Sequence, residues 1–156
     1  MDLAKFVECY SPADLERISF RSNGKNGPDL LDENSGFRIQ VFRALKDGLS
    51  ASDTLIRDLY DAESQWSAAA WCVRHEITAF LAGELLRRGG AENVRHFLNC
   101  IRRGQDFYLS SLCFQITPSE RAAAVTDMEL VLATEPEKPV GWRGVIEGIK
   151  QRGQLK

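Results

Sequence analysis

The amino-acid sequence predicts an all-α fold, a single domain of about seven helices packed around a central buried helix. Three observations indicate this class. Apolar residues recur at helical spacing through most of the 156 residues, N-capping signals precede several of these stretches, and glycines or prolines separate them. Only residues 107–116, FYLSSLCFQI, have the composition of a strand, and their helical neighbours favour a helix there too. Short helical hairpins stacked like a solenoid are an alternative arrangement of the same elements.

The predicted central helix spans Trp66 to Arg88, and a Gly-Gly pair ends it. Its large apolar residues lie on one side of a helical wheel and mostly small residues on the other, which is typical of a helix buried on nearly all sides. Asp53 opens a helix that leads directly into it. A continuous helix from Asp53 to Arg88 would be about 54 Å long, too long for a compact domain of this size. We therefore expect a kink or break near residues 64–67.

Helical spacing also appears on both sides of the central helix, with a loop and a linker between the elements. Residues 21–36 are predicted to form a loop, because two Asn-Gly steps and a Gly-Pro step interrupt regular structure there. Residues 135–139 contain two prolines and are predicted to form a stiff linker. Thr117, Pro118 and Glu120 give the sharpest helix-start signal, with the N-cap, first-position proline and glutamate of a capping box. The further helices are expected over residues 2–9, 11–20, 37–49, 91–103, 107–116, 117–134 and 141–151.

Composition and charge argue against several classes of function. The net charge is −2 and hydrophobic residues make up 44% of the chain, as in an ordinary soluble protein. No apolar run reaches the roughly 18 residues of a membrane-spanning helix, and residues 1–10 lack the features of a signal peptide. We therefore expect a cytoplasmic protein without membrane contact, in which the four cysteines are reduced. Five arginines between residues 87 and 103 form a basic cluster, but the sequence pI is near 5.7 and nucleic-acid binding is not expected.

Sequence motifs of catalysis are missing. The chain contains no Gly-x-Ser-x-Gly and no phosphate-binding glycine loop, and His75-Glu76 lacks the second histidine of the zinc-protease motif. We therefore predict a non-enzymatic protein-binding module without a cofactor. A bacterial inhibitor or immunity protein that binds and neutralises a toxin or effector is an example of this class.

Acidic residues predict where such a partner binds. Asp58 and Asp61 are three residues apart on the outward face of a predicted helix, and Asp29, Asp32 and Glu33 cluster in the preceding loop. Clustered negative charge attracts a basic partner and speeds association. We therefore expect a protein partner with a basic surface. A solvated helix face is the alternative explanation of the same residues.

A metal-binding helical bundle is the alternative function. Residues 59–63 with Gln65 resemble the first helix of some ferritin-like bacterial proteins, in which an inward glutamate binds a di-iron centre. The family pattern also needs Glu-x-x-His on the facing helix, whereas Glu92 and His96 of this chain are four residues apart. The ligands in this alternative are Glu63, His75, Glu84 and His96.

Two Cys/His pairs have the spacing of one helix face. Cys72 and His75 are three residues apart, His96 and Cys100 are four apart, and zinc accepts both residue types. In an antiparallel hairpin that turns at the Gly-Gly pair, however, the two histidines are offset by about 12 Å, far beyond zinc's bonds of roughly 2 Å. We therefore expect no zinc site that joins the two pairs.

Overall fold

The structure is a computed structural model that describes residues 2–135 and 140–152. Within these ranges the chain is all-α, as predicted, with eight α-helices, two 3-10 helices and an isolated β-bridge between Ser22 and Asp32. The α-helices are α1 (Leu3–Glu8), α2 (Ser35–Lys46), α3 (Asp53–Ala70), α4 (His75–Arg88), α5 (Ala91–Cys100), α6 (Gln105–Ser111), α7 (Pro118–Thr134) and α8 (Trp142–Arg152). The 3-10 helices are η1 (Pro12–Arg17) and η2 (Gly27–Asp29).

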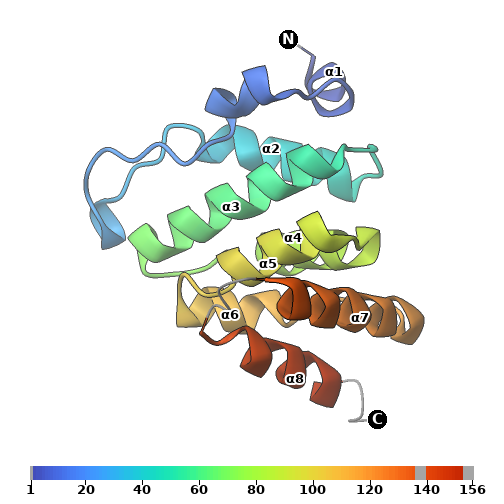
Figure 1. The fold of residues 1–156 in the computed structure, drawn as a ribbon. Coiled ribbons are helices and arrows are strands. Elements are labelled where there is room, and N and C mark those ends of the chain that lie inside the picture. The colour runs from blue at the N-terminus through green and yellow to red at the C-terminus, as the bar shows by residue number, and fades with distance from the viewer. Residues whose placement is uncertain (1, 136–139, 153–156) are drawn as a thin grey trace.

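The helices are stacked largely in chain order, as Figure 1 shows. α1, η1 and α2 form one end of the stack and α8 forms the other, with α3 and α4 between them. α4 contacts α3, α5, α6 and α7, so it holds the central position that the sequence predicts for this region. α3 also contacts α5 and α6, and this packing places residues near position 60 beside residues near position 100.

The prediction of one continuous central helix from Trp66 to Arg88 is wrong. α3 ends at Ala70 and α4 begins at His75, so the break lies a few residues beyond the expected position at 64–67. Trp71 adopts the left-handed conformation, with φ of 55°, and terminates α3. The Ser67 hydroxyl donates a hydrogen bond to the carbonyl of Cys72 at 2.7 Å, which satisfies a carbonyl in the turn.

Local signals elsewhere place the helix ends as predicted. The Thr117 hydroxyl accepts a hydrogen bond from the Glu120 amide at 3.2 Å, and the Glu120 carboxylate accepts one from the Thr117 amide at 2.7 Å, so the capping box is confirmed. Gly89 and Gly90 both have positive φ and separate α4 from α5. Residues 136–139 of the predicted linker lie outside the described residues.

Two predicted helices differ in kind or length. The segment expected to be helical over residues 11–20 forms the 3-10 helix η1. The segment 107–116 is helical only as far as Ser111, within α6, and then runs irregularly to Thr117. Leu112 and Phe114 of this irregular segment are buried. A Cβ at Gly83 of α4 would lie 3.5 Å from Cβ of Phe114, so the small residue allows this close approach.

The buried apolar side chains form one cluster that runs through the stack. Tyr60, Phe97 and Phe107 bring α3, α5 and α6 together, and the ring centroid of Tyr60 lies 6.0 Å from that of Phe97 and 5.0 Å from that of Phe107. The Tyr60 hydroxyl is hydrogen-bonded to Ser111 at 2.7 Å, which satisfies the polar end of a fully buried ring. Across the described part of the chain, the helices are too short or too polar for any to span a membrane.

Candidate functional site

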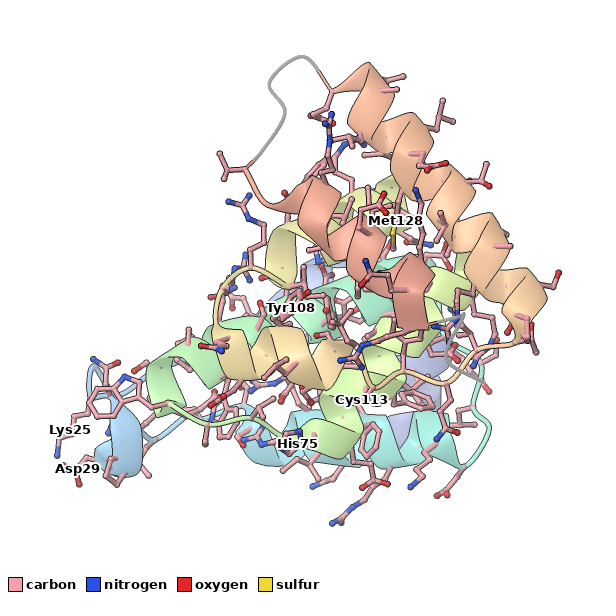
Figure 2. All side chains as sticks on the ribbon, turned by 90° about the horizontal axis from the view of Figure 1, so that it is seen from below. Lys25, Asp29, His75, Tyr108, Cys113 and Met128 are labelled. Carbon is pink, nitrogen blue, oxygen red and sulfur yellow. The ribbon has the colours of Figure 1, made fainter. Side chains whose placement is uncertain are left out.

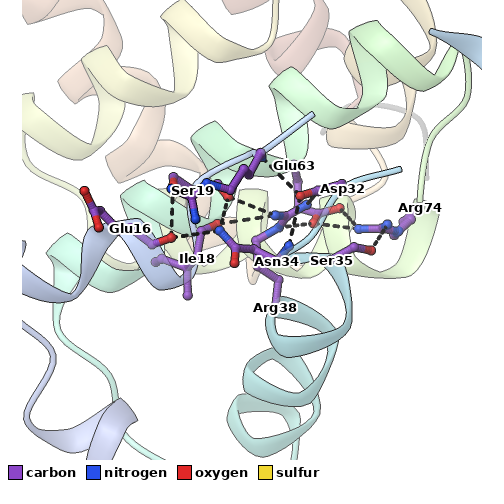
Figure 3. Close-up of polar contacts among 10 residues, drawn as sticks. Glu16, Ile18, Ser19, Asp32, Asn34, Ser35, Arg38, Glu63 and Arg74 are labelled. Carbon is purple, nitrogen blue, oxygen red and sulfur yellow. Dashed lines mark hydrogen bonds and ion pairs between the residues drawn. The ribbon is translucent and has the colours of Figure 1, made fainter. Parts of the chain in front are cut away.

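Glu63, a predicted metal ligand on α3, lies in a buried network of ion pairs (Figure 3). Its carboxylate accepts hydrogen bonds from Nε of Arg38 at 2.8 Å and from Nη1 of Arg74 at 2.9 Å. Arg38 also pairs with the buried carboxylate of Asp32 at 2.5 Å. Two carboxylates therefore face two guanidinium groups, and the formal charges balance. A metal ion at Glu63 would have to displace two arginines.

The network joins four segments that are far apart in the sequence. Arg38 comes from α2, Asp32 from the preceding loop, Glu63 from α3 and Arg74 from the turn before α4. Arg74 also donates to the Ser35 hydroxyl at 2.5 Å. The contacts pair and hydrogen-bond the buried charges, which is the condition under which charges are found in a protein interior.

The other ligands of the metal alternative do not converge on Glu63. Glu84 forms ion pairs with Arg87 and Arg88 on its own helix. His75 hydrogen-bonds through Nδ1 to the Ser110 hydroxyl at 3.0 Å. His96 uses Nε2 to reach the backbone carbonyl of Arg57 at 2.9 Å. Each histidine therefore has a hydrogen-bond partner other than a metal ligand of this set. The ferritin-like set, Glu63, His75, Glu84 and His96, is thus distributed over separate interactions.

The five acidic residues predicted to bind a partner occupy different environments. Asp32 is buried against Arg38. Asp58 accepts a hydrogen bond from the Tyr10 hydroxyl at 2.7 Å, and burial together with this carboxylate raises the pKa of Tyr10. Asp61 is paired with Arg103 at 2.7 Å. Asp29 and Glu33 are exposed.

Trp71 is a surface feature that the sequence reasoning missed, because it assigned this residue to a continuous helix. Its side chain is 71% exposed. Two ring carbons would lie 2.8 Å from a Cβ at Gly27, so the ring covers a glycine that has no side chain to exclude it. Leu31, in the same loop as Gly27, is 68% exposed. The Gly-Pro step at Gly27 predicts an irregular loop, but nothing local pairs it with a tryptophan forty-four residues later.

η2 packs against α3, and Trp71 follows the end of α3. We call Gly27, Asp29 and Trp71, with the exposed Leu31 of the same loop, the Trp71 surface. Figure 2 shows Asp29 and the neighbouring Lys25 projecting at this end of the molecule. A cleft of about 350 Å³ adjoins Trp71 and reaches the start of α6. Its lining includes Ser67, Cys72, Arg103 and Asp106.

A second cleft of about 440 Å³ lies between α2 and α4. Phe42 and Phe80 form an edge-to-face pair in its wall. Its charged side chains include Lys46 and Glu76, which form an ion pair with each other. Both of these side chains are more than half exposed.

Among the described residues, one group of three potential metal ligands comes together: Asp61 of α3 with His96 and Cys100 of α5. The sequence predicts that His96 and Cys100 share a helix face. It assigns Asp61 to the outward face of α3, whereas the structure places it beside α5.

Comparison of the sequence with family models and with curated proteins, and of the fold with solved structures, gives no significant match.

Proposed function

We propose that this protein is a non-enzymatic protein-binding module of the inhibitor or immunity type, which binds and neutralises a toxin or effector through the Trp71 surface. The observation that carries this proposal is the exposed side chain of Trp71 on a left-handed backbone. The left-handed conformation costs a residue with a Cβ roughly 1–2 kcal/mol. Such strain is concentrated at functional sites, and tryptophan is enriched among the residues that dominate binding energy.

The position of Trp71 differs from that of its neighbour Trp66. The guanidinium of Arg74 lies 3.7 Å from the centre of the Trp66 ring and shields it, while Trp71 remains exposed. A flat aromatic side chain held against Gly27 presents apolar area with little freedom to lose on binding. These features suit an anchor for a partner protein.

The charge around this anchor supports a basic partner. Asp29 is exposed two residues after Gly27, and Glu33 is exposed further along the same loop. Glu33 pairs with Arg21 at 3.7 Å, and Asp58 and Asp61 interact with Tyr10 and Arg103. Asp29 is therefore the acidic residue of choice for steering a basic partner toward Trp71.

Site-specific photo-crosslinking in the source cells tests this proposal. A photoreactive phenylalanine analogue replaces Trp71 in one variant and Leu130 in the control, because Leu130 of α7 is also a well-exposed apolar residue. We expect position 71, and not position 130, to capture one protein partner. Equal capture at both positions, or capture at neither, would contradict the proposal.

Affinity measurements with the captured partner then decide the role of the side chains. We expect Trp71→Ala to weaken binding at least tenfold, about 1.4 kcal/mol, and Leu130→Ala to leave it unchanged. Asp29→Lys should slow association several-fold, whereas Asp47→Lys, at an exposed position after α2, should not. A partner that binds Trp71→Ala as tightly as the wild type would rule out the Trp71 surface.

A further inference from the structure

We propose that Asp61, His96 and Cys100 form a binding site for a transition-metal dication, with Zn²⁺ the best match to the donor set. A ring nitrogen of His96, a carboxylate oxygen of Asp61 and Sγ of Cys100 all lie within 4.8 Å of one another. Nitrogen, oxygen and sulfur donors around a tetrahedral zinc ion lie about 3.5 Å apart, given bonds of 2.0–2.3 Å. Small side-chain rotations would close this difference.

The backbone arrangement already brings the three donors to one place. His96 and Cys100 are four residues apart on α5, so they lie on the same face of the helix one turn apart. α3 packs against α5 and supplies Asp61 from the other side. Three protein ligands from two packed helices leave a fourth position for water, as in open zinc sites.

His96 is held in the state that a metal ligand needs. A carbonyl oxygen accepts hydrogen bonds only, so Nε2 must carry the proton that it donates to the Arg57 carbonyl at 2.9 Å. Nδ1 then carries the lone pair. Ligating histidines commonly donate their other ring N–H to a backbone carbonyl in this way.

Cys100 is almost fully buried, at 1% exposed, and its thiol points at Asp61 with Sγ 3.5 Å from Oδ1. In the metal-free protein the thiol carries the proton of this hydrogen bond, because a carboxylate oxygen only accepts. Binding of the dication forms a metal–sulfur bond and releases the thiol proton to solvent. The positive charge of the dication offsets the free-energy cost of burying the resulting thiolate. An isolated buried thiolate has no such compensating charge.

Arg103 occupies the place of the cation in the metal-free protein. Its Nη1 lies 2.7 Å from Oδ1 of Asp61 and 2.5 Å from the Ser64 hydroxyl. The Arg103 side chain is partly exposed, in the turn after α5, so it can move toward solvent when the metal binds. Arg103 and the metal therefore compete for the same carboxylate, and the arginine lowers the metal affinity.

The test uses the full chain without an affinity tag, in a background in which Cys9, Cys72 and Cys113 are replaced by serine. These three cysteines are exposed, so the background retains Cys100 as its single thiol. Titration with Co²⁺ should give a thiolate-to-cobalt charge-transfer band at one equivalent, and Zn²⁺ should displace the cobalt. Cys100→Ser should abolish the band, and His96→Gln or Asp61→Asn should weaken binding at least tenfold.

We expect Arg103→Gln to bind the metal several-fold more tightly than the background, because the arginine no longer competes for Asp61. This variant leaves the three ligands intact, so it tests the site even where a ligand variant folds poorly. Circular dichroism of each variant checks its folding. Absence of a charge-transfer band, a band that survives Cys100→Ser, or unchanged affinity in Arg103→Gln would overturn the proposal. In that case Cys100 is a buried thiol that donates a hydrogen bond to Asp61. None of these outcomes depends on the Trp71 surface or on a protein partner.

Discussion

Replacing Arg38 by methionine should lower the free energy of unfolding more than the same replacement of any surface arginine does. The Arg38 side chain is 1% exposed and lies between two carboxylates, those of Asp32 and Glu63, which are buried to the same degree. Methionine fills much of the same space but carries no charge. The variant therefore leaves two buried carboxylates with one remaining guanidinium, that of Arg74.

The expected loss of folding free energy depends on the hydrogen bonds that each carboxylate retains in the variant. Removal of one partner from a buried ion pair typically costs about 3–5 kcal/mol. Glu63 keeps both of its hydrogen bonds with Arg74, at 2.9 and 3.1 Å. Asp32 keeps the backbone amides of Arg21 and Asn34, at 3.1 and 3.2 Å. We therefore expect the lower end of the range, about 3 kcal/mol, or a fall in melting temperature of roughly 6–12 °C for a chain of this size.

Urea denaturation followed by far-UV circular dichroism measures this loss. The matched control is Arg21→Met, because Arg21 pairs with Glu33 at 3.7 Å and both side chains are more than half exposed. Such surface pairs contribute about 0–1 kcal/mol. Glu63→Met combined with Arg38→Met completes a double-mutant cycle, and we expect a coupling of about 2 kcal/mol. A loss below about 1 kcal/mol for Arg38→Met, or additive single effects, would refute the assignment of this network as a structural element.

Three further predictions concern other parts of the fold. Trp71→Gly should be more stable than Trp71→Ala by about 0.5–1 kcal/mol in urea denaturation. Both variants lose the ring, but glycine adopts the left-handed backbone without strain. Equal denaturation midpoints would show that the backbone at residue 71 is unstrained. Thr117→Ala should cost about 1 kcal/mol through loss of the N-cap, while Ser119→Ala, at an exposed position in the same turn, should be nearly neutral. Hydrogen bonds from Arg88 and Asn93 lower the pKa of Asp53 below its ordinary value of 3.8, so Asp53 stabilises the fold above that pH and the stabilisation is lost as the pH falls. The stability difference between wild type and Asp53→Asn should be below about 1 kcal/mol at neutral pH, because the carboxylate is half exposed. This difference should shrink in acid. A stability difference that is constant with pH would contradict the stabilising role of the Asp53 carboxylate.

The sequence predicts those elements whose signals are local. The capping box at Thr117 satisfies the first amides of α7 from residues within one turn, and a Gly-Gly pair separates α4 from α5 by its own backbone preference. Helical periodicity likewise places the buried side of α5 and predicts that His96 and Cys100 share a face. Each of these features depends on residues a few positions apart.

The break between α3 and α4 has no such local signal. The residues around it, WSAAAWC, favour a helix or tolerate one, and neither glycine nor proline marks the end. What accompanies the break is non-local: Trp71 lies over Gly27, and Arg74 reaches Glu63 one helix back. The contact between α3 and α5 is also non-local, and helical periodicity within each segment does not predict it. The observed neighbour of His96 and Cys100 is Asp61 of α3, which periodicity alone assigned to solvent.

The buried network and the exposed Trp71 surface are parts of one structural solution. Arg74 follows the break and turns back to pair with Glu63 and to cover Trp66. A chain that continued as a helix through residues 71–74 would carry Arg74 about three turns beyond Glu63, some 16 Å along the axis, and the two side chains would not pair there. The reversal that balances the buried charge is therefore the same reversal that places Trp71 outside the helix and against the loop at Gly27. The ion pairs in the interior and the surface that we propose for partner binding therefore both depend on this break.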